Sequence, residues 1–122
     1  MLISKRAQGI GFNVIAENPC FKCAFIKHSE QYSFGDVIEM KRHNETDEIF
    51  VLLCGNAVML TFENNSFKET ILEKETAYNV TKGTYHYLAL SEDAIAFVTE
   101  KANTSKENTD VLKLEKSYKI NW

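Results

Sequence analysis

The chain of 122 residues contains only one proline, five glycines and three cysteines. An odd number of cysteines excludes complete disulfide pairing within the chain, so we expect free thiols and a reducing compartment. The longest apolar run, Ile49 to Cys54, has six residues, far fewer than the ~20 that span a bilayer. The first eight residues lack the apolar stretch of a secretory signal. These absences predict a cytoplasmic protein with no membrane partner.

The chain also lacks a block of basic residues. Lys and Arg together number 14 against 17 Asp and Glu, which gives a net charge of −3. Nucleic-acid binding needs clustered positive charge to displace counterions from the phosphates, so we expect no nucleic-acid partner. The 44% hydrophobic content suffices for one core in a chain of this length. We therefore predict a single globular domain over residues 1–122.

The chain does contain short segments in which apolar and polar residues alternate, and no window of a dozen residues has helical periodicity. Alternation with a period of two places successive side chains on opposite faces of a strand. The pattern predicts an all-β fold of barrel or sandwich type. The predicted strands are Cys23–Lys27, Val37–His43, Glu48–Cys54, Asn56–Glu63, Phe67–Glu73, Tyr85–Leu90 and Ala94–Glu100.

Asparagine supplies many of the turns in a chain with so little glycine and proline. Ten asparagines are present, and asparagine tolerates the positive φ that tight turns require. The pair Asn64-Asn65 separates a strand carrying Val58 and Phe62 from one carrying Phe67. We predict a β-hairpin with its tip at this pair.

Several strands combine ionisable and apolar side chains on one face. Residues two apart point the same way, so we expect one face of this strand to carry Val37, Glu39, Lys41 and His43. If the strands close into one barrel, polar groups from three strands surround a pocket with apolar walls, which is a common construction of ligand sites. The polar groups are Glu39, Lys41, His43, Glu48 and His86, and the walls are Phe50, Leu52 and Leu88.

The spacing of these residues resembles the first motif of the cupins, G-x5-H-x-H, three or four residues, E-x6-G. Here Gly35 is followed after five residues by Lys41 and then His43, after four more by Glu48, and after six more by Gly55. Every spacing agrees, and the single departure is Lys41 in place of the first histidine.

A second cupin motif, G-x5-P-x-G-x2-H-x3-N, is similar to the stretch from Glu75 to Leu90. Thr81 stands in the place of its proline, and only Gly83 and His86 keep the motif residues. The two motifs and the strand-rich segment between them cover residues 35–90, about half of the chain.

The resemblance implies a double-stranded β-helix, the cupin jelly-roll barrel, with a divalent iron, manganese, nickel or zinc ion inside. Of the family's three histidines and one glutamate, His43, Glu48 and His86 remain as metal ligands, and Lys41 occupies the fourth position. Two imidazoles and a carboxylate suit a metal site with open positions. An ammonium group nearby would repel the cation. In a metal-free alternative, Lys41 pairs with Glu48 or Glu39 and its charge replaces that of the ion.

Two classes of function follow. In the first, the chain is a non-catalytic module that binds a small sugar-like or carboxylated ligand in its polar cavity. In the second, it is a metal-dependent enzyme, and similarity to small sugar-phosphate-isomerase-like cupins implies isomerase or epimerase chemistry with Glu39 or Glu48 as the base. A non-haem oxygenase is a third reading, based only on the two-histidine, one-carboxylate set. The sequence identifies no catalytic residue.

The resemblance to small cupins also implies a homodimer. The segment Ile10–Ala16 and the tail Tyr118–Trp122 carry apolar side chains that a short barrel need not cover. We expect these segments to pack on the barrel or on a partner, with Trp122 as a packing anchor or an interface residue.

Overall fold

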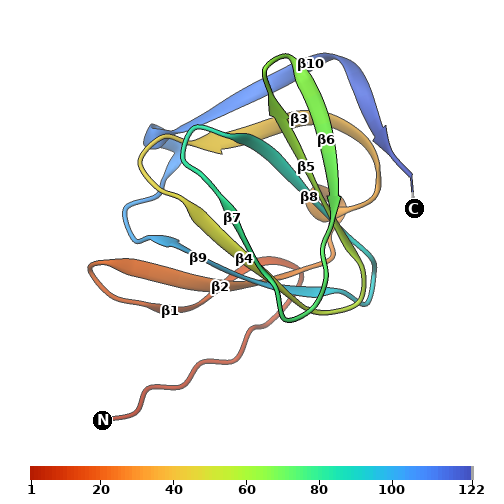
Figure 1. Cartoon of the computed structure of the whole chain (residues 1–122). Coiled ribbons are helices and arrows are strands. Elements are labelled where there is room, and N and C mark those ends of the chain that lie inside the picture. The colour runs from red at the N-terminus through yellow and green to blue at the C-terminus, as the bar shows by residue number, and fades with distance from the viewer. Residues whose placement is uncertain (122) are drawn as a thin grey trace.

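The computed structural model describes residues 1–121 as two five-stranded sheets that face each other (Figure 1). Trp122, and with it the expected anchor, lies outside the described residues. The first sheet has the order β1 (Gly11–Glu17), β2 (Phe21–Lys27), β9 (Ile95–Lys101), β4 (Glu48–Cys54) and β7 (Ala77–Val80). The second has the order β10 (Thr109–Ile120), β3 (Gly35–His43), β8 (Tyr85–Leu90), β5 (Ala57–Glu63) and β6 (Ser66–Ile71).

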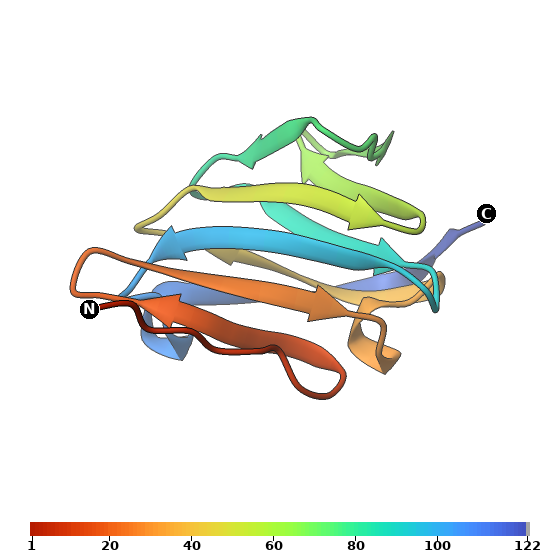
Figure 2. The same ribbon diagram turned by 90° about the horizontal axis from the view of Figure 1, so that it is seen from below.

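All pairings within the two sheets are antiparallel, and most neighbours are distant in sequence. Figure 2 shows β1, β2, β9, β4 and β7 side by side in that order. The remaining elements are two 3-10 turns, η1 (Glu30–Tyr32) and η2 (Lys106–Asn108). Within residues 1–121 no helix has the length and apolar character needed to cross a membrane. The prediction of an all-β jelly roll is confirmed.

Each predicted strand overlaps an observed one, and β4 and β8 have the predicted bounds. The hairpin at Asn64-Asn65 is confirmed, because both residues have positive φ (52° and 58°) and Glu63 pairs with Ser66 across the turn. β1, β7 and β10 were not predicted as strands. β7 has only four residues, too few for alternation to stand out.

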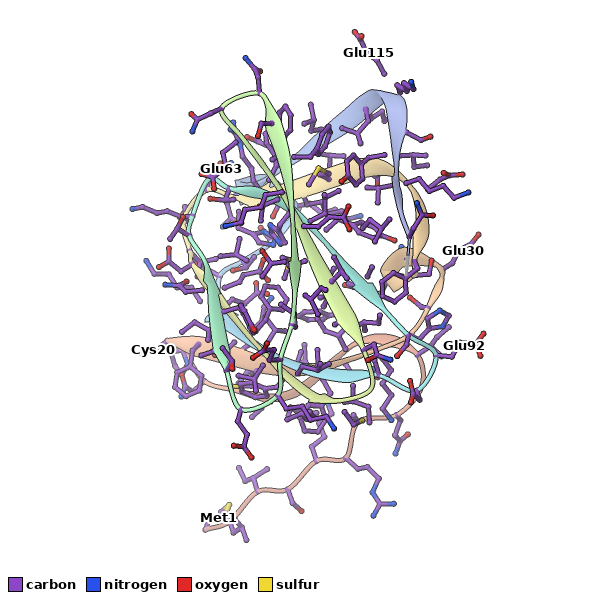
Figure 3. The ribbon with its side chains drawn as sticks, turned by 45° about the vertical axis from the view of Figure 1, so that its right-hand side comes forward. Met1, Cys20, Glu30, Glu63, Glu92 and Glu115 are labelled. Atoms are coloured by element: carbon purple, nitrogen blue, oxygen red, sulfur yellow. The ribbon has the colours of Figure 1, made fainter. Side chains whose placement is uncertain are left out.

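Two clusters of buried apolar side chains stabilise the two sheets. The larger fills the space between them, where Figure 3 shows the side chains crowding together. It includes Phe50, Leu52, Met59, Leu88 and Val98. The smaller lies on the other face of the second sheet and includes Met40, Val58, Leu60 and Ala89. Tyr118 and Ile120 of β10 pack into the smaller cluster, so the apolar tail covers part of its own barrel.

Strict alternation along β3 was expected and is wrong. Val37 and Met40 are three positions apart, yet both are buried in the smaller cluster. Opposite them, the pairing with β10 shifts between Lys113 and Tyr118. Such an irregularity bends a strand and resets which face its side chains point to. The consequence is that Val37 does not share a face with His43.

Candidate metal centre

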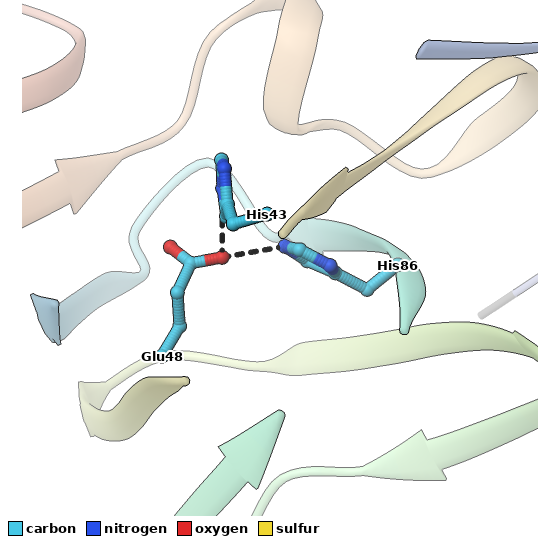
Figure 4. Close-up of side chains that lie close together, drawn as sticks. All are labelled: His43, Glu48 and His86. Carbon is cyan, nitrogen blue, oxygen red and sulfur yellow. Dashed lines mark ion pairs between the residues drawn. The ribbon is translucent and has the colours of Figure 1, made fainter. Parts of the chain in front are cut away.

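His43, Glu48 and His86 meet between the two sheets (Figure 4). Oε1 of Glu48 lies 3.0 Å from Nε2 of His43 and 2.8 Å from Nε2 of His86. One potential ligand atom from each residue lies within 4.8 Å of the others. Glu48 is buried at 4% exposure, and the two imidazoles are partly buried. The structure thus brings the three expected ligand residues together.

The two sheets contribute different parts of this cluster. Glu48 begins β4 of the first sheet, while His43 ends β3 and His86 lies in β8 of the second. The backbone N–H of Gly83 donates to the carbonyl oxygen of His43 at 2.8 Å, which ties the loop before β8 to the end of β3. Asp47 accepts a hydrogen bond of 2.8 Å from the backbone N–H of Lys82 in the same loop. These contacts fix the distance between the strands that carry the histidines.

The outer nitrogen of each histidine has a partner that determines its tautomer. Nδ1 of His86 lies 3.0 Å from the carbonyl oxygen of Thr84, which can only accept, so this nitrogen carries the hydrogen. Nδ1 of His43 lies 2.8 Å from Oγ1 of Thr109. The hydroxyl of Thr109 already donates its hydrogen to the carbonyl oxygen of Ser105 at 2.7 Å, so it accepts from His43. Partners of this kind orient histidines that bind metals.

With Nδ1 protonated, each neutral imidazole directs the lone pair of Nε2 toward the carboxylate of Glu48. Its Oε1 is buried and receives no hydrogen bond of good geometry within the described chain. Three electron-rich atoms at such short range need a positive charge between or on them. Two donors about 2.1 Å from one ion and at right angles to each other are about 3.0 Å apart. The observed spacings of 2.8 and 3.0 Å between Glu48 and the histidines are close to this value, and they are also ordinary hydrogen-bond distances.

Protonation of an imidazole is the other way to supply that charge. Burial alone would raise the pKa of Glu48, but the contacts and charges of His43 and His86 lower it to about 2. Burial lowers the pKa of His43, and the contact with Glu48 outweighs it and raises the pKa. The carboxylate is thus ionised at neutral pH and attracts either protons or a metal ion to the histidines.

Glu100 of β9 and Tyr32 of η1 belong to the same neighbourhood and were missed as site residues. Burial, followed by the charge of Glu48, raises the pKa of Glu100. Burial, followed by the charges of Glu48 and Glu100, raises the pKa of Tyr32 to about 12. The inward direction of Glu100 was predictable from the sequence, because alternation along a predicted strand places it on the same face as Ala96 and Val98.

Of the expected apolar walls, Phe50 contacts the site. Phe50, Leu52 and Leu88 are each 3% exposed and belong to the larger cluster. The ring of Phe50 packs edge-on against that of His86, with 6.0 Å between their centroids. None of these three residues lines either of the two cavities described below.

Lys41 does not fill the corner left by the missing histidine. It pairs with His86 across β3 and β8, but its side chain is exposed. The expected ion pair with Glu48 or Glu39 is not formed within residues 1–121, where Glu48 pairs with the two histidines. A lysine stem of four methylenes can carry the ammonium group out to water. Glu39 is half-buried and remains apart from the His43–Glu48–His86 cluster.

No model of a known protein family matches the chain, and no curated protein matches it in sequence. Solved structures do resemble it. A cupin-2 domain protein from Shewanella frigidimarina is 21% identical with a TM-score of 0.59, and the match covers 79% of this chain and 84% of that one. Pac13, a nucleoside dehydratase from Streptomyces, is 10% identical with a TM-score of 0.64, covering 91% and 86%. QdtA, a sugar 3,4-ketoisomerase from Thermoanaerobacterium thermosaccharolyticum, is 10% identical with a TM-score of 0.60, covering 72% and 64%.

These likenesses and the sheet order show the cupin jelly-roll fold, and the fold expected from the two motifs is confirmed. Its His43–Glu48–His86 cluster could hold a metal ion. Some of the similar structures are sugar-modifying enzymes, and some were crystallised with small molecules, uridine or TDP.

Proposed function

We propose that the chain binds a small sugar-like or carboxylated ligand beside a divalent metal ion held by His43, Glu48 and His86. The observation that carries this proposal is the convergence of three donor atoms whose outer partners leave both Nε2 lone pairs facing Glu48. Iron, manganese, nickel and zinc all accept this donor set. When bound, such an ion acts as a Lewis acid toward an oxygen of the ligand.

Metal analysis of untagged protein, purified without chelating resin and reloaded with each of the four ions, tests the proposal. We expect near-stoichiometric metal in the wild type and its loss in His86→Ala, because that change removes one of only three protein donors. His28→Ala is the matched control, since His28 lies outside the cluster and its loss should leave the metal content unchanged. Equal metal contents in His86→Ala and His28→Ala, or a wild type that takes up no ion, would contradict the proposal.

A metal-dependent isomerase or epimerase is the second candidate, and Glu100 favours it. Proton transfer at a carbon atom needs a group that holds and releases a proton beside the ion. Glu48 is engaged by both histidines, whereas Glu100 is buried at 7% exposure and has a raised pKa. In this reading the Glu100 carboxyl moves the proton, and the similarity to a sugar ketoisomerase supports it.

Exchange of carbon-bound hydrogen in D₂O tests the enzyme reading without a known substrate. The metal-loaded protein would be incubated with a panel of aldoses and ketoses, and loss of proton signals followed by NMR. We expect exchange by the wild type and its loss in Glu100→Gln, with metal content retained. The absence of exchange across the panel, or equal exchange by Glu100→Gln, would contradict a catalytic role.

We also propose a cytoplasmic homodimer. Of the segments expected to self-associate, Tyr118 and Ile120 are occupied within the chain. Ile10 and Phe12 are exposed at 75% and 40%, and Leu2 and Ile3 of the N-terminal arm are more exposed still. These exposed apolar side chains near the N-terminus support self-association. A monomer mass by light scattering at micromolar concentration would contradict the homodimer.

A further inference from the structure

A cavity of about 290 Å³ opens between β7 of the first sheet and β5 and β6 of the second. The strands that bound it are labelled β5, β6 and β7 in Figure 1. Its lining is rich in hydroxyl and amide groups. The polar residues are Thr61, Glu63, Thr70, Asn79, Thr81 and Thr84.

Cross-strand pairing places this cavity beside the candidate metal centre. Thr61 pairs directly with His86, and Val80, another lining residue, pairs with Glu48. Directly paired residues of antiparallel strands point to the same face, with Cβ atoms about 5 Å apart. The carbonyl of Thr84 also accepts the Nδ1 hydrogen of His86. A ligand in the cavity would therefore lie against β5 and β7, the strands next to those that carry His86 and Glu48.

The charges of the lining discriminate between ligand classes. No lysine or arginine lines the cavity along the described chain, and its one ionisable acid is Glu63. Phosphate and carboxylate groups are bound by cations or by clustered N–H donors. A threonine hydroxyl can donate and accept, so it matches the hydroxyl of a ligand in either direction. The hydroxyl of Thr61 makes only one contact, a long one of 3.5 Å to the carbonyl oxygen of Lys68, and is free to engage a ligand.

We propose that this cavity binds an uncharged polyhydroxylated ligand the size of one sugar ring and rejects phosphorylated and carboxylated analogues. The size follows from the volume, since about 290 Å³ holds roughly ten waters at about 30 Å³ each. The inference goes beyond the proposed function, because none of His43, Glu48 and His86 lines the cavity and the charge argument uses the lining side chains alone.

The second cavity is built differently. It has a volume of about 510 Å³, and Lys82 and Lys101 are among its lining residues. Ile49 and Thr99, which also line it, pair with each other across β4 and β9 next to the inward-facing Glu48 and Glu100. They therefore point to the outer face of the first sheet. Glu100 also lines this second cavity, which therefore extends from the outer face toward the neighbourhood of Glu48. Neither lysine lines the cavity at Thr61.

The test measures binding of D-glucose, glucose 6-phosphate and D-glucuronate to the protein by NMR with a chelator present, so that no metal ion attracts the anions, and with amide shifts reporting the location. We expect glucose to shift residues around Thr61 and Thr70, and each anionic analogue to bind there about ten-fold more weakly. Thr61→Val keeps the shape and removes the hydroxyl, so it should weaken glucose binding about two- to ten-fold. Thr99→Val, the same change on the outer face, is the control and should have no effect.

Tighter binding of an anionic analogue than of glucose at Thr61 would overturn the inference. No glucose binding at millimolar concentration, or equal affinities in Thr61→Val and Thr99→Val, would overturn it as well. Thr70→Val provides a second hydroxyl deletion if Thr61→Val does not fold. The metal analysis of untreated protein tests the proposed function separately. Anion preference in the presence of chelator defeats this inference alone, whereas untreated protein that takes up no metal defeats the proposed function alone.

Discussion

In the metal-free protein, the charge of Glu48 holds the two imidazoles in place, and Glu48→Gln should therefore remove a pH-dependent part of the folding free energy. The contacts with His43 and His86 overcome burial and lower the pKa of Glu48 from 4.5 to about 2. Glutamine keeps the shape of the side chain and cannot carry the charge. The substitution thus isolates the electrostatic part of the cluster.

The loss of this stabilisation at low pH follows from the lowered pKa of Glu48. A carboxyl with a lower pKa in the folded chain than in the unfolded chain stabilises the fold when it is ionised in both states. The shift from 4.5 to about 2 corresponds to roughly 3 kcal/mol at neutral pH. This contribution is fully present above the unfolded pKa of 4.5 and is lost as the pH falls toward about 2. By about pH 3, roughly 2 kcal/mol of it should be gone.

The loss of stabilisation at high pH follows from the raised pKa of His43. Burial lowers its pKa, but the contact with Glu48 and the charge of Glu48 prevail, and the net shift is upward from 6.5. A histidine whose pKa is raised by folding stabilises the fold below its unfolded pKa, and the contribution is lost as the pH rises through the folded pKa. The stabilisation by the cluster should therefore have its maximum between the pH range in which Glu48 becomes protonated and the pH range in which His43 loses its proton.

Urea unfolding followed by circular dichroism, with a chelator present and the pH varied from about 3 to about 9, measures this profile. The free energy of unfolding of the wild type minus that of Glu48→Gln should be bell-shaped in pH. Glu45→Gln, an exposed carboxylate three residues away, is the control and should run parallel to the wild type. If Glu48→Gln also runs parallel to the wild type, the cluster carries no charge-dependent stability and the reasoning fails.

Two further predictions concern the support of the site and a turn of the fold. Thr109→Val should weaken metal binding about 10- to 100-fold in a chelator competition, because valine cannot accept the Nδ1 hydrogen of His43; an unchanged affinity would contradict the orienting role. Gly55→Ala should destabilise the fold by about 3 kcal/mol or more in urea unfolding, because φ is +76° and the new Cβ would lie 2.5 Å from Cα of Ala94. Gly83→Ala, at φ +80° with open space around it, should cost only about 1–2 kcal/mol, and equal losses would refute the steric argument.

Alternation and motif spacing were sufficient to predict the central strands, because those strands bury one face in the core. β4 and β8 have the predicted bounds. The edge strand β7 and the long β10 were not predicted, since their pairing depends on partners distant in sequence. β10 also leaves register with β3 between Lys113 and Tyr118, which no local pattern indicates.

The meeting of His43, Glu48 and His86 was predictable from spacing because strand geometry converts sequence distance into position. Their supporting contacts were not. The partner of His86 is the backbone carbonyl of Thr84, and a backbone contact does not depend on residue type. The partner of His43 is Thr109, which lies 66 residues away in the sequence. The position of the Lys41 ammonium group was predicted wrongly, because alternation gives only the direction of the Cβ atom. The long, flexible side chain of lysine can place its charged end elsewhere.

The exposed Lys41 reconciles an altered cupin motif with a metal site. The objection to a metal was that an ammonium group in the cavity would repel the ion. With the side chain exposed, water screens that repulsion. Glu48 raises the pKa of His43 overall, so a metal ion competes with a proton for Nε2, because metal ions bind the unprotonated imidazole. The lysine that interrupts the motif thus leaves the other three donor residues available to a metal ion.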